Sequence, residues 1–204
     1  MIDSQCVAFD AEVLICGSIS TGDCYSYHVV KEEYKKTAEY PWNVELQGHS
    51  VIKCDVEAGT GEDKNIVTLL SFGGSPYHGR HTLMMRYQSV WSGESSKKVE
   101  NRWLPLANGE IIGRDNDDLQ GARALISGTN KDLLFVTHNR CHIKVIDMKS
   151  YRYISDVQNA VLPVSNENRA SFHCFVLLKT NTFVLISEDE SFLSNTTNIK
   201  RTLY

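Results

Sequence analysis

The stretch Thr68-Leu69-Leu70-Ser71-Phe72-Gly73-Gly74 decides how the rest of the chain is interpreted. It is a short apolar run that ends on two glycines, and such a run bounded by turn residues is typical of a buried β-strand. Three more stretches have the same character, at residues 13–18, 133–137 and 183–187. The four stretches begin at residues 13, 68, 133 and 183, so they recur every 50 to 65 residues.

Further β-branched and aromatic runs, separated by Gly, Asn, Asp and Ser clusters, predict the other strands. No segment of ten residues shows the apolar recurrence of a helix, so we expect no helix longer than about two turns. The charged run at residues 30–36 is interpreted as a hairpin tip. The expected strands are residues 5–9, 12–16, 24–30, 34–40, 49–54, 66–72, 82–91, 102–106, 122–127, 132–137, 142–147, 151–156, 172–178 and 182–187.

Each of the four apolar strands follows another short strand, and three are followed by two more, so the repeating unit has four strands. A four-stranded unit that recurs at roughly 50 residues has the spacing of a β-propeller blade. Insertions at residues 55–65, 92–101 and 108–120 explain the longer intervals. The sequence therefore predicts a single all-β domain of antiparallel four-stranded blades over residues 1–204. The blades are placed at about 4–43, 48–107 and 121–163, with a partial blade at 171–204.

A small antiparallel sheet has two faces to cover, so blades must stack around an axis. We assign the apolar runs 69–72 and 133–136 to the strands nearest that axis. The residues expected to be buried are Leu70, Phe72, Leu134, Val136, Leu185, Cys16 and Cys174. The fourth unit ends after two strands and a candidate third at 198–203, so we expect an incomplete propeller. An uncovered apolar blade face would then lead to self-association or to completion by another chain.

The second unit resembles the kelch repeat, in which an apolar strand ends in Gly-Gly and is followed by a tyrosine strand and a tryptophan. Here these are Phe72-Gly73-Gly74, Met85-Arg86-Tyr87 and Trp103. The first unit has Cys16-Gly17-Ser18, Tyr25-Ser26-Tyr27 and Tyr34 in the corresponding places, and is similar to kelch-like proteins of protists. The third unit departs from the pattern, with Thr137-His138-Asn139 in place of the glycines, and its Val145-Ile146-Asp147 equally resembles WD-type or YVTN-type blades. The resemblance implies protein–protein recognition through loops at one rim of a propeller.

The charge and composition of the chain argue against some classes of function and localisation. A net charge of −4 and a pI near 6.0 argue against a nucleic-acid surface, which needs a basic stripe. No secretion signal and no apolar segment long enough to span a membrane is found, so the cytoplasm is expected by default. In that compartment the six scattered cysteines are interpreted as buried free thiols.

Candidate reactive groups have simpler structural interpretations. No Gly-x-Ser-x-Gly elbow occurs. His138, Cys141 and His142, joined by His173 and Cys174, offer zinc-type ligands but lack a Cys-x-x-Cys pair, so we interpret them as turn and core residues. Residues 115–118 lack the glycine and glutamate of a calcium loop and are interpreted as solvated. We therefore expect no metal and no cofactor.

The remaining candidates are loop aromatics and cations. Tyr77, His78 and Arg80 follow the Gly-Gly pair, and Trp91 precedes an insertion. Tyrosine, tryptophan and arginine often anchor protein interfaces, so these four residues form the predicted contact set. The alternative is structural: Trp91 packs between blades, and His81, which follows Arg80, opens a strand. The predicted function is a non-enzymatic scaffold for a protein partner. A propeller-based enzyme, or a truncated propeller without independent activity, is the alternative.

Overall fold

The protein is all-β. The computed structural model describes residues 2–54, 65–93, 99–138, 142–154, 173–180, 182–186 and 191–195. Within these ranges there is no helix, and hence none that could span a membrane. The first sheet consists of β1 (Gln5–Phe9), β2 (Glu12–Ser18), β3 (Thr21–His28) and β4 (Glu33–Glu39), and the second of β5 (Ser50–Cys54), β6 (Ile66–Gly73), β7 (His81–Gln88) and β8 (Leu104–Pro105). In both sheets the strands are antiparallel and follow chain order.

The third and fourth sheets have three strands each among the described residues. The third is formed by β9 (Arg123–Ser127), β10 (Leu133–His138) and β11 (His142–Asp147), and the fourth by β12 (Cys174–Lys179), β13 (Thr182–Ile186) and β14 (Ser191–Asn195). The strand predicted at 151–156 is reduced to one bridge between Ile146 and Tyr153 within residues 142–154. The third strand of the last sheet is β14, earlier in the chain than the 198–203 segment proposed for it, which lies outside the described residues.

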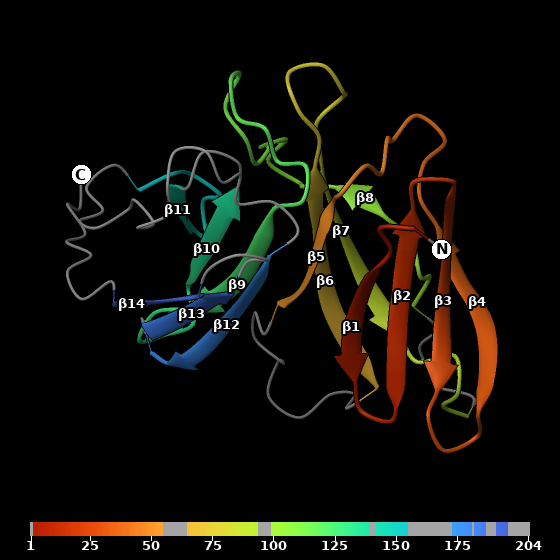
Figure 1. Ribbon diagram of the computed structural model, residues 1–204. Coiled ribbons are helices and arrows are strands. Elements are labelled where there is room, and N and C mark those ends of the chain that lie inside the picture. Colours follow the sequence, from red (N-terminus) through yellow and green to blue (C-terminus); the bar gives the residue numbers. More distant parts are fainter. Residues whose placement is uncertain are drawn as a thin grey trace.

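The four sheets stack face to face in chain order, as propeller-like blades do (Figure 1). On β6, Leu69 faces the first sheet while Leu70 and Phe72 face the third. On β10, Leu134 packs toward the second sheet and Phe135 toward the fourth. The second and third sheets therefore bury both faces, which explains why these two strands are apolar without alternation. The described residues form no closed ring.

The assignment of β6 and β10 to the axis is wrong. The strands that approach each other from sheet to sheet are the first of each unit, with β1 beside β5, β5 beside β9 and β9 beside β12. β6 and β10 are second strands, paired on both edges within their own sheets. Their apolar character comes from having both faces covered by neighbouring sheets, and not from proximity to the axis.

The burial predictions hold at all but one position. Leu70, Phe72, Leu134, Val136, Leu185 and Cys16 are buried, whereas Cys174 is exposed. On β12, Phe175 packs against the third sheet, so the neighbouring Cys174 points to the opposite face of the fourth sheet. The described residues leave that face open at Val176, which is 43% exposed. Cys6 is exposed as well, so the interpretation of the cysteines as uniformly buried is corrected at two positions.

The Gly-Gly pair has the structural role expected of it. Gly74 has φ +101°, and a Cβ there would lie 2.5 Å from the carbonyl oxygen of Gly79. A Cβ on Gly73 would lie 2.9 Å from that of His49. Both positions therefore require the absence of a side chain, which allows β6 to turn sharply beside the start of β5.

Candidate protein-interaction surface

Loops of the first two sheets gather at one end of the strands. Because neighbouring strands are antiparallel, β2, β4 and β6 all end at the same end of the stack. We call this end the Gly-Gly rim: it comprises the turns 19–20 and 74–80, the connection 40–49 and the loop 107–121 (upper part of Figure 1). The opposite end, with the turn 29–32 and residues 89–93, is called the hairpin rim.

Large apolar side chains are exposed on each loop of the Gly-Gly rim. Trp42 is 97% and Tyr77 is 93% exposed, and Ile19 and Ile111 are about half exposed. A tryptophan almost fully in water is unusual, because its apolar area strongly favours burial. Trp42 is absent from the residues predicted from the sequence. The signal that could have found it is the dipeptide Pro41-Trp42, an aromatic residue placed in a connection directly after a strand end.

Two grooves lie between these loops. One, of about 470 Å³, lies between the turn 18–22 and residues 44–47. The other, of about 480 Å³, is lined by residues 75–80 together with Ile111, Gly113 and Asp115. His78 borders both grooves, and its Nδ1 lies 3.0 Å from a carboxylate oxygen of Glu45. The predicted residues Tyr77, His78 and Arg80 therefore lie together between two hollows on one rim.

Arg80 is a support for this surface more than a contact on it. Its guanidinium donates to the carbonyl oxygens of Gly113, at 3.4 Å, and Asp115, at 2.7 Å, and its side chain is 19% exposed. The loop is fixed from its other side as well, where Gly113 N–H donates to the Tyr153 hydroxyl at 2.8 Å. Arg80 thus ties the loop 107–121 to the turn that carries Tyr77.

The turn itself is held by Ser75. Its hydroxyl accepts from the backbone N–H groups of Tyr77 and His78, each at 3.2 Å, and its own N–H donates to the His78 carbonyl at 3.0 Å. A loop fixed before binding has less conformational entropy to lose when a partner arrives. Tyr77 is therefore presented to solvent on a preorganised turn.

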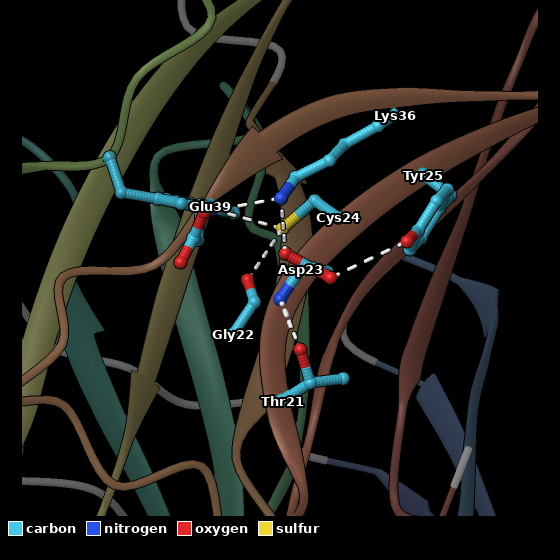
Figure 2. Close-up of polar contacts among 8 residues, drawn as sticks. Thr21, Gly22, Asp23, Cys24, Tyr25, Lys36 and Glu39 are labelled. Carbon is cyan, nitrogen blue, oxygen red and sulfur yellow. Dashed lines mark hydrogen bonds and ion pairs between the residues drawn. The ribbon is translucent and has the colours of Figure 1, made fainter.

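An ion-pair network follows directly on the turn that lines the first groove (Figure 2). The Lys36 ammonium lies 2.5 Å from Asp23 and 3.2 Å from Glu39, which joins the start of β3 to the end of β4. The hydrogen bond from Lys36 lowers the pKa of Asp23, and the same pair raises the pKa of Lys36. The contacts are solvent-exposed, so they orient the strands without adding much stability.

Trp91 lies at the hairpin rim, separated from the other three predicted residues. Its indole N–H donates to the Ser26 hydroxyl at 2.8 Å, and the ammonium groups of Lys31 and Lys35 lie 5.2 and 4.1 Å from its ring centre. Ser26 belongs to the first sheet, whereas Trp91 follows the second. This geometry favours the alternative considered above, in which Trp91 packs between blades, and His81 indeed opens β7.

A buried polar cluster lies beneath the Gly-Gly rim. The Tyr40 hydroxyl donates to Ser71 at 2.8 Å, and Ser71 lies 3.2 Å from His81 Nε2, while His49 donates from Nε2 to the carbonyl oxygen of Cys16 at 3.0 Å. Burial lowers the pKa of His49 to about 4 and, with a smaller effect from His49, that of His81 to about 3. Both imidazoles are therefore neutral at pH 7 and serve as hydrogen-bonding core residues.

Potential metal ligands do not converge in the described ranges. There, no three His, Cys, Asp or Glu side chains come together. Of the zinc-type residues noted in the sequence, His138 and His173 are buried, with His173 Nε2 2.5 Å from the Thr137 hydroxyl. Cys141 and the side chain of His142 lie outside the described residues. At 115–118, Asp117 accepts from Arg114 N–H at 3.0 Å and Asp118 from Gln120 N–H at 3.1 Å, as carboxylates in a turn do.

Neither a protein-family model nor a curated protein sequence matches this chain.

Proposed function

We propose that the protein is a non-enzymatic binding scaffold of kelch-like propeller type, which holds a protein partner on the Gly-Gly rim. The observation that carries this proposal is the exposure of Trp42 and Tyr77 on neighbouring loops, with Tyr77 on a turn that Ser75 holds in place. Aromatic anchors surrounded by polar groups are the usual composition of a protein-binding hot spot.

The kelch assignment has support from the positions of its motif residues. Gly74 adopts the positive φ that the Gly-Gly turn requires. Tyr87 and Trp103 are both buried between the first and second sheets, where a motif residue that joins neighbouring blades is needed. A cytoplasmic setting belongs to the same proposal.

The test is affinity capture with the full chain, followed by a direct binding measurement on each captured protein. The variant is the double substitution Trp42→Ala and Tyr77→Ala. The matched control is Val30→Ala with Tyr34→Ala, two exposed residues near the hairpin rim. Removal of two exposed aromatics leaves the fold intact, because surface substitutions change stability by about 0.5 kcal/mol or less.

We expect at least one partner to bind the wild type and the hairpin-rim control equally, and the Gly-Gly rim variant at least about tenfold more weakly, since hot-spot residues each contribute about 2 kcal/mol or more. A partner that binds all three proteins equally would move the interaction to another surface. Loss of binding in the hairpin-rim control alone would assign function to the opposite rim.

A further inference from the structure

Two cysteines face each other at the base of a Gly-Gly rim turn. Cys16 on β2 and Cys24 on β3 are directly paired across the antiparallel strands. Paired positions lie about 4.5–5.5 Å apart at Cα and project their side chains to the same face. That separation is within the range of about 4.4–6.8 Å found for disulfides. Both thiols are buried in the core between the first and second sheets.

The surroundings give the two sulfurs different properties. The Cys16 thiol donates a hydrogen bond to the Cys24 sulfur, which raises the pKa of Cys16 and, together with its burial, keeps it protonated. Cys24 receives the hydrogen bond from Cys16, another from the Trp103 indole N–H at 3.4 Å, and one from the Gly17 N–H, and these lower its pKa against the opposing effect of burial. Three donors therefore converge on the Cys24 sulfur and favour its thiolate, whereas burial and the bond that its S–H donates to the Gly22 carbonyl oxygen, at 3.7 Å, favour the thiol.

We propose that Cys16 and Cys24 form a peroxide-sensitive dithiol that closes to an intramolecular disulfide across β2 and β3. The strand register places the two cysteines close enough for a disulfide. The hydrogen-bond donors around Cys24 favour the thiolate that must react first. Of the described cysteines, Cys6 and Cys174 are exposed and stand on different sheets, so they serve as internal comparisons.

The reaction balances with hydrogen peroxide as the oxidant. The Cys24 thiolate attacks one peroxide oxygen, the O–O bond breaks, and Cys24 becomes a sulfenic acid while hydroxide leaves and takes up a proton. The Cys16 sulfur then attacks the Cys24 sulfur, the S–O bond breaks, and the Cys16 proton leaves with the departing hydroxide as water. Two thiols and one peroxide thus give one disulfide and two water molecules, and a dithiol reductant reverses the change.

The position of the pair determines what the disulfide would constrain. Residues 17–23 lie between the two cysteines, and residues 18–22 line one groove of the Gly-Gly rim. A cross-link at the base of this turn reduces its freedom to open. Because both thiols are buried, peroxide reaches them when the turn opens, so the reaction is expected to be slower than alkylation of Cys6 and Cys174.

The experiment maps the cross-link in the folded wild-type chain. Exposed thiols are first blocked with N-ethylmaleimide under native conditions, and the protein is then treated with hydrogen peroxide. After denaturation and alkylation with a second reagent, cleavage by trypsin and Asp-N separates Cys16, in residues 10–22, from Cys24, in residues 23–31, and from Cys6, in residues 3–9. Mass spectrometry then identifies which peptides are joined.

We expect the peptide of residues 10–22 to be joined to that of residues 23–31 in most molecules before any other cross-link forms. The joined peptides should weigh two hydrogen atoms less than the two free peptides together, and dithiothreitol should separate them. The proposal is overturned if native protein gives no such link, if Cys16 or Cys24 joins another unblocked cysteine or a second chain instead, or if the link forms only in urea. In urea we expect mixed cross-links, because the register no longer selects the pair.

A spectroscopic readout tests the same site without mapping. The double substitution Trp42→Phe and Trp91→Phe leaves Trp103, whose indole N–H contacts the Cys24 sulfur. We expect peroxide to lower the fluorescence of this variant reversibly, with no such change when Cys16→Ser is added. Equal fluorescence loss with and without Cys16 would contradict disulfide formation at this pair.

Discussion

The second and fourth sheets are built from similar apolar strands but occupy different environments. On β6 of the second sheet, residues of both faces are buried, and Leu69, Leu70 and Phe72 have no exposed area. On β12 of the fourth sheet, Phe175 packs inward while Val176 and Leu178 remain exposed. An apolar strand in this fold therefore has a buried face for each neighbouring sheet, and its own composition does not reveal how many neighbours it has.

The largest difference between the two sheets should appear on truncation of their apolar side chains. Phe72→Ala should lower the free energy of unfolding by about 3–5 kcal/mol, because it opens a cavity between two covered faces. Val176→Ala, on the open face, should cost less than about 1 kcal/mol. Urea titration of both variants measures the contrast. Equal losses would show that the outer face of the fourth sheet is covered in solution.

The second effect is a loss of stability in acid through the histidines at the second sheet. In the unfolded chain a histidine has a pKa near 6.5, whereas His49 and His81 have values of about 4 and about 3 in the fold. Below pH 6.5 the unfolded state therefore binds more protons, so stability falls as pH falls, until the folded values are reached. Between pH 7 and pH 5 each histidine should account for about 1–2 kcal/mol.

The measurement for this effect is urea titration at pH 7 and pH 5 on the wild type and on His81→Gln. The variant should lose less stability than the wild type over that interval. Ile19→Ala, at the exposed Gly-Gly rim, removes no titratable group; it is the control and should keep the wild-type dependence. If His81→Gln also keeps it, His81 is not buried neutral in the folded protein.

A third effect, of similar size to that of one histidine, concerns the hydrogen bonds that join the first and second sheets. The hydroxyl groups of Ser26 and Tyr87 both donate to one carboxylate oxygen of buried Glu12, each at 2.6 Å. Tyr87→Phe removes one donor from this carboxylate and should cost about 1–3 kcal/mol. Tyr34→Phe, at an exposed position of β4, should leave the unfolding midpoint unchanged. A similar loss of stability in both variants would show that the hydrogen bond from Tyr87 to Glu12 makes no specific contribution.

The smallest effect on stability is expected on the open face of the fourth sheet. Val176→Glu should change the unfolding free energy by about 0.5 kcal/mol or less. We expect the wild type to associate as its concentration rises and to bind a hydrophobic dye, and the charged variant to do both less. Sedimentation velocity across a concentration series measures the first property. A monomeric wild type at every concentration would argue against association through this face.

Strand positions could be predicted because they depend on local composition. β1 and β11 were placed to the residue, whereas the hairpin tip predicted at 30–36 overlaps the turn 29–32 only in part, because residues 33–36 belong to β4. Strand β14 was missed because Ser191-Phe192-Leu193-Ser194-Asn195 contains no β-branched residue and becomes a strand through pairing with β13. Cys16 and Cys174 lie in similar apolar runs, yet only the stacking of sheets decides that one is buried and the other exposed.

Part of the candidate site could also be predicted from local sequence. Tyr77 and His78 were identified because the Gly-Gly pair predicts a turn directly before them. Trp91 was grouped with them by residue type, although β7 runs away from that turn and ends at the opposite rim. Following the strand directions from the Gly-Gly turn would have placed Trp91 at the rim opposite Tyr77 and His78. Trp42 was missed because it lies outside the repeat motif, although the dipeptide Pro41-Trp42 marks it in the connection between the first and second sheets.

The carboxylate of Glu12 has a consequence for how the chain is assembled during synthesis. One of its two donors, Ser26, is made 14 residues later, but the other, Tyr87, follows 75 residues later. When the ribosome has released the first sheet, that charge still lacks its second partner, so the N-terminal hairpins must stay partly hydrated until β7 emerges. We therefore expect the first sheet to complete its fold only together with the second.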